Sequence, residues 1–294
     1  MTRNEFRFVD RLRVRWAEVD AQKIVFNGHY LMYFDTAVAG YWRALAVPYA
    51  QTMERLGGDL YVRKATLEYE ASAAYDDMLH VGMRCARIGN SSVLFSGAAF
   101  RQDRLLVSCE LVYVFADPHS QTSKPVPQGL RDVFLGFESG QDMVDLRLGS
   151  WADLGRDAKA IRTEVFVAEQ KIAAQLERDE GDAHGVHAVA YNRLGLPLAT
   201  GRWVQHATGA AKIGRMAVIQ PMRSAAVGRR VLNALMRSAK DSGNDQAVLH
   251  AQTSAEAFYR RAGFVVRGPV FEEAGIAHVE MVRSLGDLAM NAGA

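Results

Sequence analysis

A run of aromatic and aliphatic residues between positions 28 and 46 constrains the fold of this 294-residue chain more than any other feature. A surface helix buries a single stripe, whereas a helix that is apolar over most of its circumference must be nearly enclosed by its neighbours. The first part of the chain therefore has to wrap around this helix. The apolar residues at helical spacing are Tyr30, Tyr33, Phe34, Ala37, Val38, Tyr41, Trp42 and Leu45.

Strand-like patterns flank this helix. One strand is expected before it, over about 6–17, and four strands are expected after it. Alternation of apolar and polar residues is clearest over 81–85 and 105–115. Cys85 and Cys109 both fall on the apolar phase, which favours small buried side chains over redox chemistry.

Turn-forming residues mark a domain boundary. Three of the seven prolines lie within 118–127, and a short helical stretch over 129–137 follows. A polar segment then precedes a new apolar alternation at 144–148. At about 100–200 residues per domain, a chain of this length suits two. We expect a first domain over 1–138, a linker over 139–143 and a second domain over 144–294.

The second half has a different order of elements, so it is no repeat of the first. It predicts a mixed α/β domain. Its expected helices cover 153–168, 225–242 and 254–262. Its expected strands cover 144–148, 186–192, 197–205, 211–219, 246–250, 264–268 and 277–283.

Composition narrows the class of protein. The net charge of +2 argues against a general nucleic-acid binder. The longest stretch without Asp, Glu, Lys or Arg, Ile88 to Phe100, has 13 residues, fewer than the ~18 that a membrane helix needs. Two cysteines cannot build a disulfide framework, and residues 1–10 have no apolar signal core. We therefore expect a cytoplasmic protein without a nucleic-acid or membrane partner.

A cationic cluster stands out in the second half. Five basic residues and no acidic residue lie between Lys212 and Arg230. The loop over 220–229 joins an expected strand to an expected helix, and backbone N–H groups at such a helix start bind phosphates. The cluster favours a small polyanionic ligand over a solvated helix face.

The segment from Trp16 to Asp35 carries a possible catalytic group. Asp20 lies in a loop seven residues before the long helix, where a carboxylate can attack as a nucleophile or activate water. N–H groups near Asn27 and Gly28 can polarise a carbonyl or hold an oxyanion. The spacing alone favours the interpretation of Asp20 as an ordinary loop or cap residue. His29 is either a substrate contact or a helix-start residue bonded to nearby backbone.

This segment resembles the hotdog-fold acyl-CoA thioesterases of the 4-hydroxybenzoyl-CoA thioesterase type. The similarity covers about 5–137 and includes the stretches 71–77, 87–92 and 124–127. It implies a long helix wrapped by an antiparallel sheet and a homodimer or homotetramer with its active site at the dimer interface. It also implies catalytic roles for Asp20, Asn27 and His29. Lys23 stands where a glycine is common in relatives.

Residues 144–283 resemble the GNAT acetyltransferases. The phosphate-loop signature appears as Arg223-x-x-Ala226-x-Gly228, and Phe258-Tyr259-x-x-Ala-Gly-Phe264 and Gly275-Ile-Ala-His278 follow it. The resemblance implies that the backbone of Met216 and Val218 binds pantetheine and that Tyr259 protonates the departing CoA thiolate. Gln252 takes the place of a frequent asparagine. The implied pyrophosphate-binding residues are Arg223, Ser224, Ala226, Gly228 and Arg229.

Other polar residues of the second half allow two interpretations. The acidic run Glu177, Asp179, Glu180 and Asp182 can recruit a cationic amine, although spacing favours a solvated loop, and Glu169 is a candidate base. His184-x-x-His187 has a metal-like spacing but no further ligand nearby, so we expect no metal site.

Together these features predict a bifunctional enzyme. Its first domain would hydrolyse acyl-CoA thioesters, and its second would transfer an acyl group from acyl-CoA or acetyl-CoA to a small amine. The alternative is a thioesterase whose second domain is a degenerate CoA-binding or oligomerisation module. Ala226 raises that alternative, because a methyl group at a glycine position can obstruct the phosphate.

Overall fold

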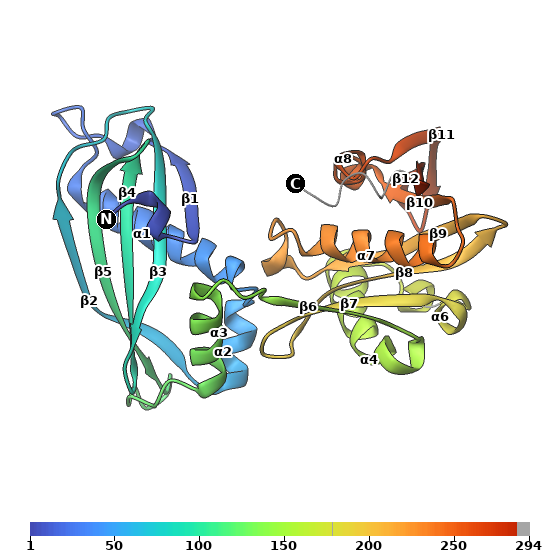
Figure 1. Ribbon diagram of the computed structural model, residues 1–294, viewed down its shortest axis with the longest axis horizontal. Coiled ribbons are helices and arrows are strands. Elements are labelled where there is room, and N and C mark those ends of the chain that lie inside the picture. The colour runs from blue at the N-terminus through green and yellow to red at the C-terminus, as the bar shows by residue number, and fades with distance from the viewer. Residues whose placement is uncertain (178, 287–294) are drawn as a thin grey trace. The chain divides into compact units, whose positions relative to one another are not determined.

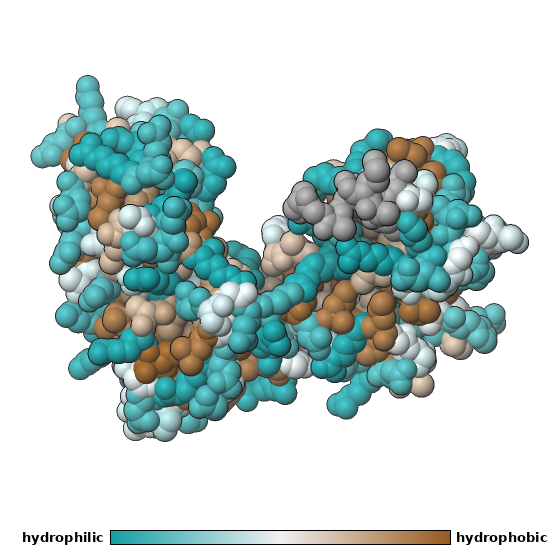
Figure 2. All heavy atoms as spheres, in the orientation of Figure 1, coloured by the Kyte–Doolittle hydropathy of each residue, from teal (hydrophilic) through white to brown (hydrophobic). Residues whose placement is uncertain are grey.

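The computed structural model describes residues 1–177 and 179–286. The chain divides into two compact units, Met1–Met143 and Val144–Ala294 (Figure 1). Hydrophilic residues cover most of the visible face of each unit, with smaller apolar groups between them (Figure 2). Within the described residues, no helix combines the length and the apolar character needed to cross a bilayer.

The first unit is a five-stranded antiparallel sheet packed on one long helix, which confirms the predicted hotdog fold (Figure 1). The strand order is β1-β3-β4-β5-β2. The helix α2 was not expected from the sequence. The elements are β1 (Phe8–Arg13), α1 (Asn27–Ala44), α2 (Tyr49–Leu56), β2 (Asp59–Tyr69), β3 (Met78–Ile88), β4 (Ser92–Arg101), β5 (Arg104–Ala116) and α3 (Gln128–Glu138).

The core of this unit forms around α1. All eight apolar residues named above are buried, and the ring of Tyr41 packs against Phe95 and Phe137 in edge-to-face contacts. Gly97 on β4 allows the helix to approach closely, since a Cβ atom there would lie 2.9 Å from the ring of Phe34. The wide apolar face is therefore buried as its pattern predicted, against the sheet and against aromatic residues of α3.

The second unit is a seven-stranded sheet in the order β11-β12-β10-β9-β8-β7-β6, as expected for a GNAT domain. The predicted helix over 153–168 is α-helical only to Arg162 and continues as a π-helical segment, Thr163–Glu169. The elements are β6 (Val144–Gly149), α4 (Trp151–Arg162), α5 (Ala174–Glu177), α6 (Gly181–His184), β7 (Val186–Asn192), β8 (Pro197–Ala207), β9 (Ala210–Val218), α7 (Val227–Asp241), β10 (Gln246–Gln252), α8 (Glu256–Arg261), β11 (Val265–Glu273) and β12 (Ile276–Ser284).

Two neighbouring strands of this sheet separate. Among the described residues, β9 and β10 pair in parallel at only three positions, ending at Val248 and Lys212. Both strands continue beyond that point, so the sheet opens into a V. On its other side β9 shifts register against β8, and Arg215 adopts a left-handed φ of 54°. The opening exposes main-chain groups of both strands to a ligand.

Candidate functional site

Asp20 lies on a tight turn just before α1. Its N–H donates to the carbonyl of Ile24 at 2.9 Å, and its Oδ1 accepts from the N–H of Gln22 at 2.8 Å. Lys23 has a left-handed φ of 62°, a conformation that favours glycine. The side chain thus makes the local contact of a loop aspartate and remains partly exposed.

Main-chain contacts hold this turn against the start of the helix. Val19 and Val25 form an antiparallel bridge, and the N–H of Phe26 donates to the carbonyl of Glu18 at 2.9 Å. The N–H of Val25 donates to the carbonyl of Ala73 at 2.8 Å, which fixes the turn to the segment before β3. Asp20 and the first turn of α1 therefore belong to one rigid junction.

The first turn of α1 presents the other predicted groups. Asn27 and Gly28 are exposed, and the first N–H groups of a helix have no intrahelical acceptor. The hydroxyl of Tyr69 donates to the carbonyl of Asn27 at 3.1 Å. The ring of His29 meets Phe26 edge-on, with centroids 5.9 Å apart. A carboxylate and a set of helix-start donors therefore flank the same surface.

Sequence reasoning missed the role of Glu18, which is only 2% exposed. Its carboxylate accepts from the main-chain N–H of Arg15 at 2.7 Å, from Nε of Arg15 at 2.6 Å and from the hydroxyl of Tyr33 at 2.7 Å. Burial by itself would raise the pKa of Glu18, but these hydrogen bonds outweigh it and lower that pKa. Glu18 thereby fastens the end of β1 to α1.

We expect Glu18→Gln to lower the free energy of unfolding by about 1–3 kcal/mol, because charge-assisted hydrogen bonds are lost. The folded pKa lies below the ordinary 4.5, so ionised Glu18 stabilises the fold above that pH and the contribution fades as the pH falls through the folded pKa. Urea unfolding at neutral and acidic pH measures both effects. The exposed Glu54→Gln is the control, and equal stability of the two variants at neutral pH would contradict this role.

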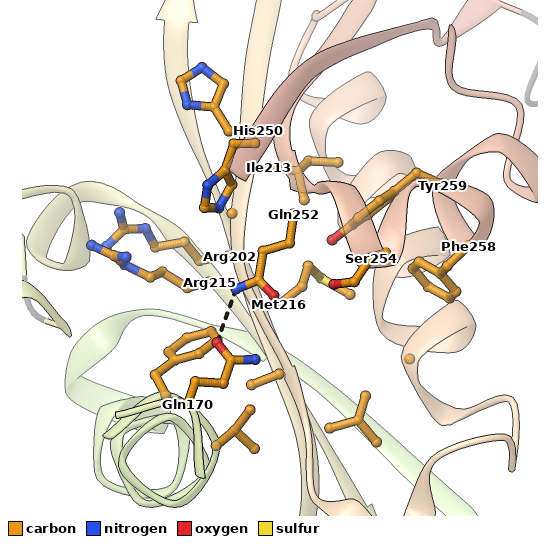
Figure 3. A pocket seen from close by; sticks show the side chains of 18 of the residues that line it. Gln170, Arg202, Ile213, Arg215, Met216, His250, Gln252, Ser254, Phe258 and Tyr259 are labelled. Carbon is orange, nitrogen blue, oxygen red and sulfur yellow. Dashed lines mark hydrogen bonds between the residues drawn. The ribbon is translucent and has the colours of Figure 1, made fainter. Parts of the chain in front are cut away.

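The second unit contains a cavity of about 1150 Å³ at the V between β9 and β10. Its wall includes the end of β9, the loop before α7 and helix α8. Figure 3 shows Met216, Gln252, Ser254 and Tyr259 gathered around this space. All nine residues predicted to serve the second site are part of its wall: Met216, Val218, Arg223, Ser224, Ala226, Gly228, Arg229, Gln252 and Tyr259.

The loop before α7 contains two non-glycine residues with a left-handed backbone. Ser224 and Ala226 adopt left-handed φ values of 68° and 58°, and Ala226 immediately precedes the helix. The helix start offers N–H donors and a partial positive charge. Gly228 permits close packing, since a Cβ atom there would lie 3.0 Å from Val218. The helix begins at Val227, two residues later than predicted.

Arg223 is held by a carboxylate. Its two terminal nitrogens donate to Glu169 at 2.7 and 2.5 Å, and its Nε donates to the carbonyl of Val218 at 3.2 Å. The hydrogen bond from Arg223 lowers the pKa of Glu169. Glu169 is therefore paired with Arg223 of the loop before α7. A carboxylate held in this ion pair is less able to accept a proton, so the pairing argues against Glu169 as the candidate base.

Tyr259 and Gln252 face the cavity from α8 and β10. Burial raises the pKa of Tyr259 to about 12, so its hydroxyl keeps its proton at neutral pH. The side-chain amide of Gln252 donates to Oε1 of Gln170 at 3.0 Å, as the dashed line in Figure 3 shows. The protonated phenol of Tyr259 and the hydrogen bond between Gln252 and Gln170 therefore both line the opening between β9 and β10.

Two members of the acidic run, Asp179 and Asp182, belong to an ion network, so the interpretation as a solvated loop is wrong for these two, whereas Glu180 is exposed. Asp182 is 6% exposed and binds Arg162, at 2.7 and 3.1 Å, and Arg202. Asp179 binds Arg202 and Arg215, and although burial opposes it, these partners lower the pKa of Asp179 to about 2. Both aspartates already have cationic partners. The side chain of Glu177 lies outside the described residues.

Among residues 1–177 and 179–286, no group of three or more His, Cys, Asp or Glu side chains could hold a metal ion. His187 of the metal-like pair is buried, and its Nε2 lies 3.0 Å from the carbonyl oxygen of Asp182. Its role in the described structure is therefore packing and hydrogen bonding.

Comparison with known proteins agrees with this geometry. Residues 14–134 match the thioesterase-like superfamily, and residues 155–285 match the acetyltransferase (GNAT) domain. The chain therefore belongs to the thioesterase-like superfamily through its first unit and to the GNAT acetyltransferases through its second.

Individual relatives cover one unit each. The uncharacterized N-acetyltransferase YjcF of Bacillus subtilis is 38% identical over 129 residues, 44% of this chain and 91% of that protein. An acyl-CoA N-acyltransferase structure from Pseudomonas aeruginosa is 31% identical, has a TM-score of 0.44 and covers 48% of this chain and 99% of its own. The structure of Slr0204, a 1,4-dihydroxy-2-naphthoyl-CoA thioesterase from Synechocystis, is 17% identical and has a TM-score of 0.40. The match covers 44% of this chain and 95% of that one.

We expect Glu169→Gln to tighten CoA binding about two- to fivefold, because an exposed ion pair that competes for Arg223 is worth about 0.2–1 kcal/mol. Calorimetry of the full chain with CoA measures the change. Glu164→Gln is the matched control, since it removes a nearby negative charge that acts on Arg223 only through space. Equal tightening in both variants would attribute the effect to charge alone, and weaker binding of Glu169→Gln would contradict the competition.

Proposed function

We propose that the chain is a bifunctional CoA-ester enzyme. The first unit hydrolyses acyl-CoA thioesters, and the second transfers the acyl group of acyl-CoA or acetyl-CoA to a small amine. The main support for the proposal is the cavity of the second unit. The start of α7 and the buried, protonated phenol of Tyr259 both line it, beside the split between β9 and β10. The junction at Asp20 supports the hydrolase half.

In the hydrolase half, the carboxylate of Asp20 activates water or attacks the thioester carbonyl itself. The N–H groups at the start of α1, near Asn27 and Gly28, stabilise the oxyanion that forms. His29 contributes a substrate contact beside them. The open turn around Asp20 gives water direct access, which hydrolysis requires.

In the transferase half, the pyrophosphate of CoA binds the loop over 223–229 and the start of α7, and Arg223 exchanges Glu169 for a phosphate. The pantetheine arm follows the main chain of Met216 and Val218 into the V. The amine attacks the thioester carbonyl, and the hydroxyl of Tyr259 gives its proton to the departing thiolate. Burial of Tyr259 keeps that proton in place until it is needed.

The two activities should be separable in the full chain by single substitutions. We expect Asp20→Asn to slow acyl-CoA hydrolysis by about 10²–10⁴ and to leave amine-dependent thiol release unchanged. Tyr259→Phe should do the reverse, while acetyl-CoA binding stays intact because only the leaving thiolate needs the proton. Thiol release from a panel of acyl-CoAs, with and without amines, measures both rates.

Asp35→Asn is the control for the hydrolase half, since Asp35 is an exposed carboxylate on α1. Wild-type hydrolysis by Asp20→Asn would rule out the proposed role of Asp20. Binding of acetyl-CoA without transfer to any amine would favour the degenerate-module alternative, for which the left-handed Ala226 and the occupied Arg223 are the structural arguments.

We propose further that the first unit assembles as a homodimer or homotetramer. β2 is an edge strand of 11 residues, and Tyr61, Val62 and Tyr69 on it are 41%, 54% and 52% exposed. A long edge strand with exposed apolar side chains can pair with another strand, and a second copy can supply that strand by symmetry. The hotdog resemblance supports the same surface.

We expect light scattering of the full chain to give at least twice the mass of one chain, and Val62→Lys to shift the mass towards a single chain because it places a charge on the edge strand. Leu135→Lys is the control: Leu135 is 61% exposed on α3, away from β2. A wild-type chain that scatters as a monomer would refute the assembly.

A further inference from the structure

His278 is a titratable side chain of the cavity to which the proposed function gives no role. It lies on β12, directly opposite Gln252 on β10 and Phe271 on β11, so the three residues form one row across the sheet. The imidazole is partly buried and forms part of the cavity wall. The row places His278 next to the amide of Gln252, at the mouth of the V.

Two contacts fix the orientation of this ring. Its Nδ1 lies 2.8 Å from the carbonyl oxygen of Ile276. A carbonyl only accepts, so Nδ1 carries a hydrogen and Nε2 is the nitrogen that can take up a proton. Phe271 stacks on the ring, with centroids 6.1 Å apart and planes at 26°. The hydrogen bond from Nδ1 holds the tautomer in which Nε2 has a free lone pair, as in histidines that act as general bases.

The other titratable groups of the cavity wall are less suited to accept a proton. Asp179 is bound by two arginines, Glu273 is paired with His250, and Tyr259 serves as the acid. His250 has both nitrogens near carboxylates, with Nδ1 2.9 Å from Glu273 and Nε2 3.9 Å from Glu280. Lys212 is a donor when charged.

We propose that Nε2 of His278 is the general base of the acyl transfer in the second unit, a role that rests on the function proposed above. The ammonium form of the amine gives its extra proton to Nε2, and the freed nitrogen lone pair then forms the C–N bond. The C–S bond breaks, the thiolate takes the proton of Tyr259, and the tyrosinate takes the second proton from the new amide nitrogen. The imidazolium loses its proton to solvent, so the products are an amide and the CoA thiol.

The charges around His278 suit a transient imidazolium. Glu273 from β11 interacts electrostatically with His278, and Glu280 lies two residues further along β12 on the same face. Lys212 from β9 and His250 from β10 oppose them, but His250 lies against both carboxylates. The imidazolium would therefore form near carboxylates that stabilise it.

The test uses the full chain with three variants. In His278→Asn the side-chain amide can still donate to the carbonyl of Ile276, but the base at the position of Nε2 is gone. His250→Asn removes the neighbouring imidazole, and His184→Asn removes an exposed one on α6. The probes are acetyl-CoA with a primary alkylamine, which is protonated at neutral pH, and with hydroxylamine, which is not.

We expect His278→Asn to lose about 10²–10⁴ of the alkylamine-dependent rate and the acidic limb of its pH profile. Acetyl-CoA binding by calorimetry should be unchanged, the rate with hydroxylamine should fall much less, and added imidazole should restore part of the alkylamine rate. His250→Asn and His184→Asn should keep the acidic limb. A wild-type profile in His278→Asn, or loss of the limb in His250→Asn instead, would overturn the assignment.

A second measurement does not depend on the amine. In ¹⁵N-histidine-labelled chain with acetyl-CoA bound, the signal that His278→Asn removes should show a proton on Nδ1 and a lone pair on Nε2. A proton on Nε2 would overturn the base while leaving transfer by the wild-type chain in place. Absence of transfer to every amine by the wild-type chain would instead overturn the proposed transferase activity, and the base with it.

Discussion

Both proposed sites depend on the unsatisfied N–H groups at the start of a helix. A helix leaves its first four N–H groups without intrahelical partners, so a ligand oxygen can take them. α1 and α7 both present their starts next to a turn that contains a non-glycine residue with a left-handed backbone, Lys23 or Ala226. Such a residue costs about 1–2 kcal/mol, and the surrounding contacts, such as the bond from Asp20 to Ile24, have to hold it in place.

Local patterns in the sequence predict the parts that depend on local physics. The apolar circumference of α1 predicts its burial, and strand alternation together with the family resemblances predicts both sheets. The lining of the second cavity was also predictable, because the phosphate loop is contiguous and its glycine position at Ala226 does adopt a left-handed φ. Asp20 could be located from its spacing to the helix, although that spacing alone did not separate a catalytic carboxylate from a capping one.

Pairings between distant residues could not be predicted in this way. Glu169 and Arg223 are 54 positions apart, and nothing in either local sequence indicates that they meet. The acidic run looked solvated because its charges are dense, yet Asp182 is buried against arginines from α4 and β8. The buried role of Glu18 could not be predicted for the same reason. It depends on a hydrogen bond from the hydroxyl of Tyr33, which lies 15 positions further along the chain on α1.

Hydrolysis and transfer place opposite demands on water, and the two sites differ accordingly. Asp20 is partly exposed and the helix start beside it is open, so water can reach a thioester there. In the second unit, Tyr259 is 8% exposed and the hydrogen bond between Gln252 and Gln170 spans the cavity. Because water competes with an amine for the same carbonyl carbon, the burial of Tyr259 would favour the amine under the proposed function. Under the proposed function, one thioester would have two fates in one chain, and the exposure of each site to solvent would decide between them.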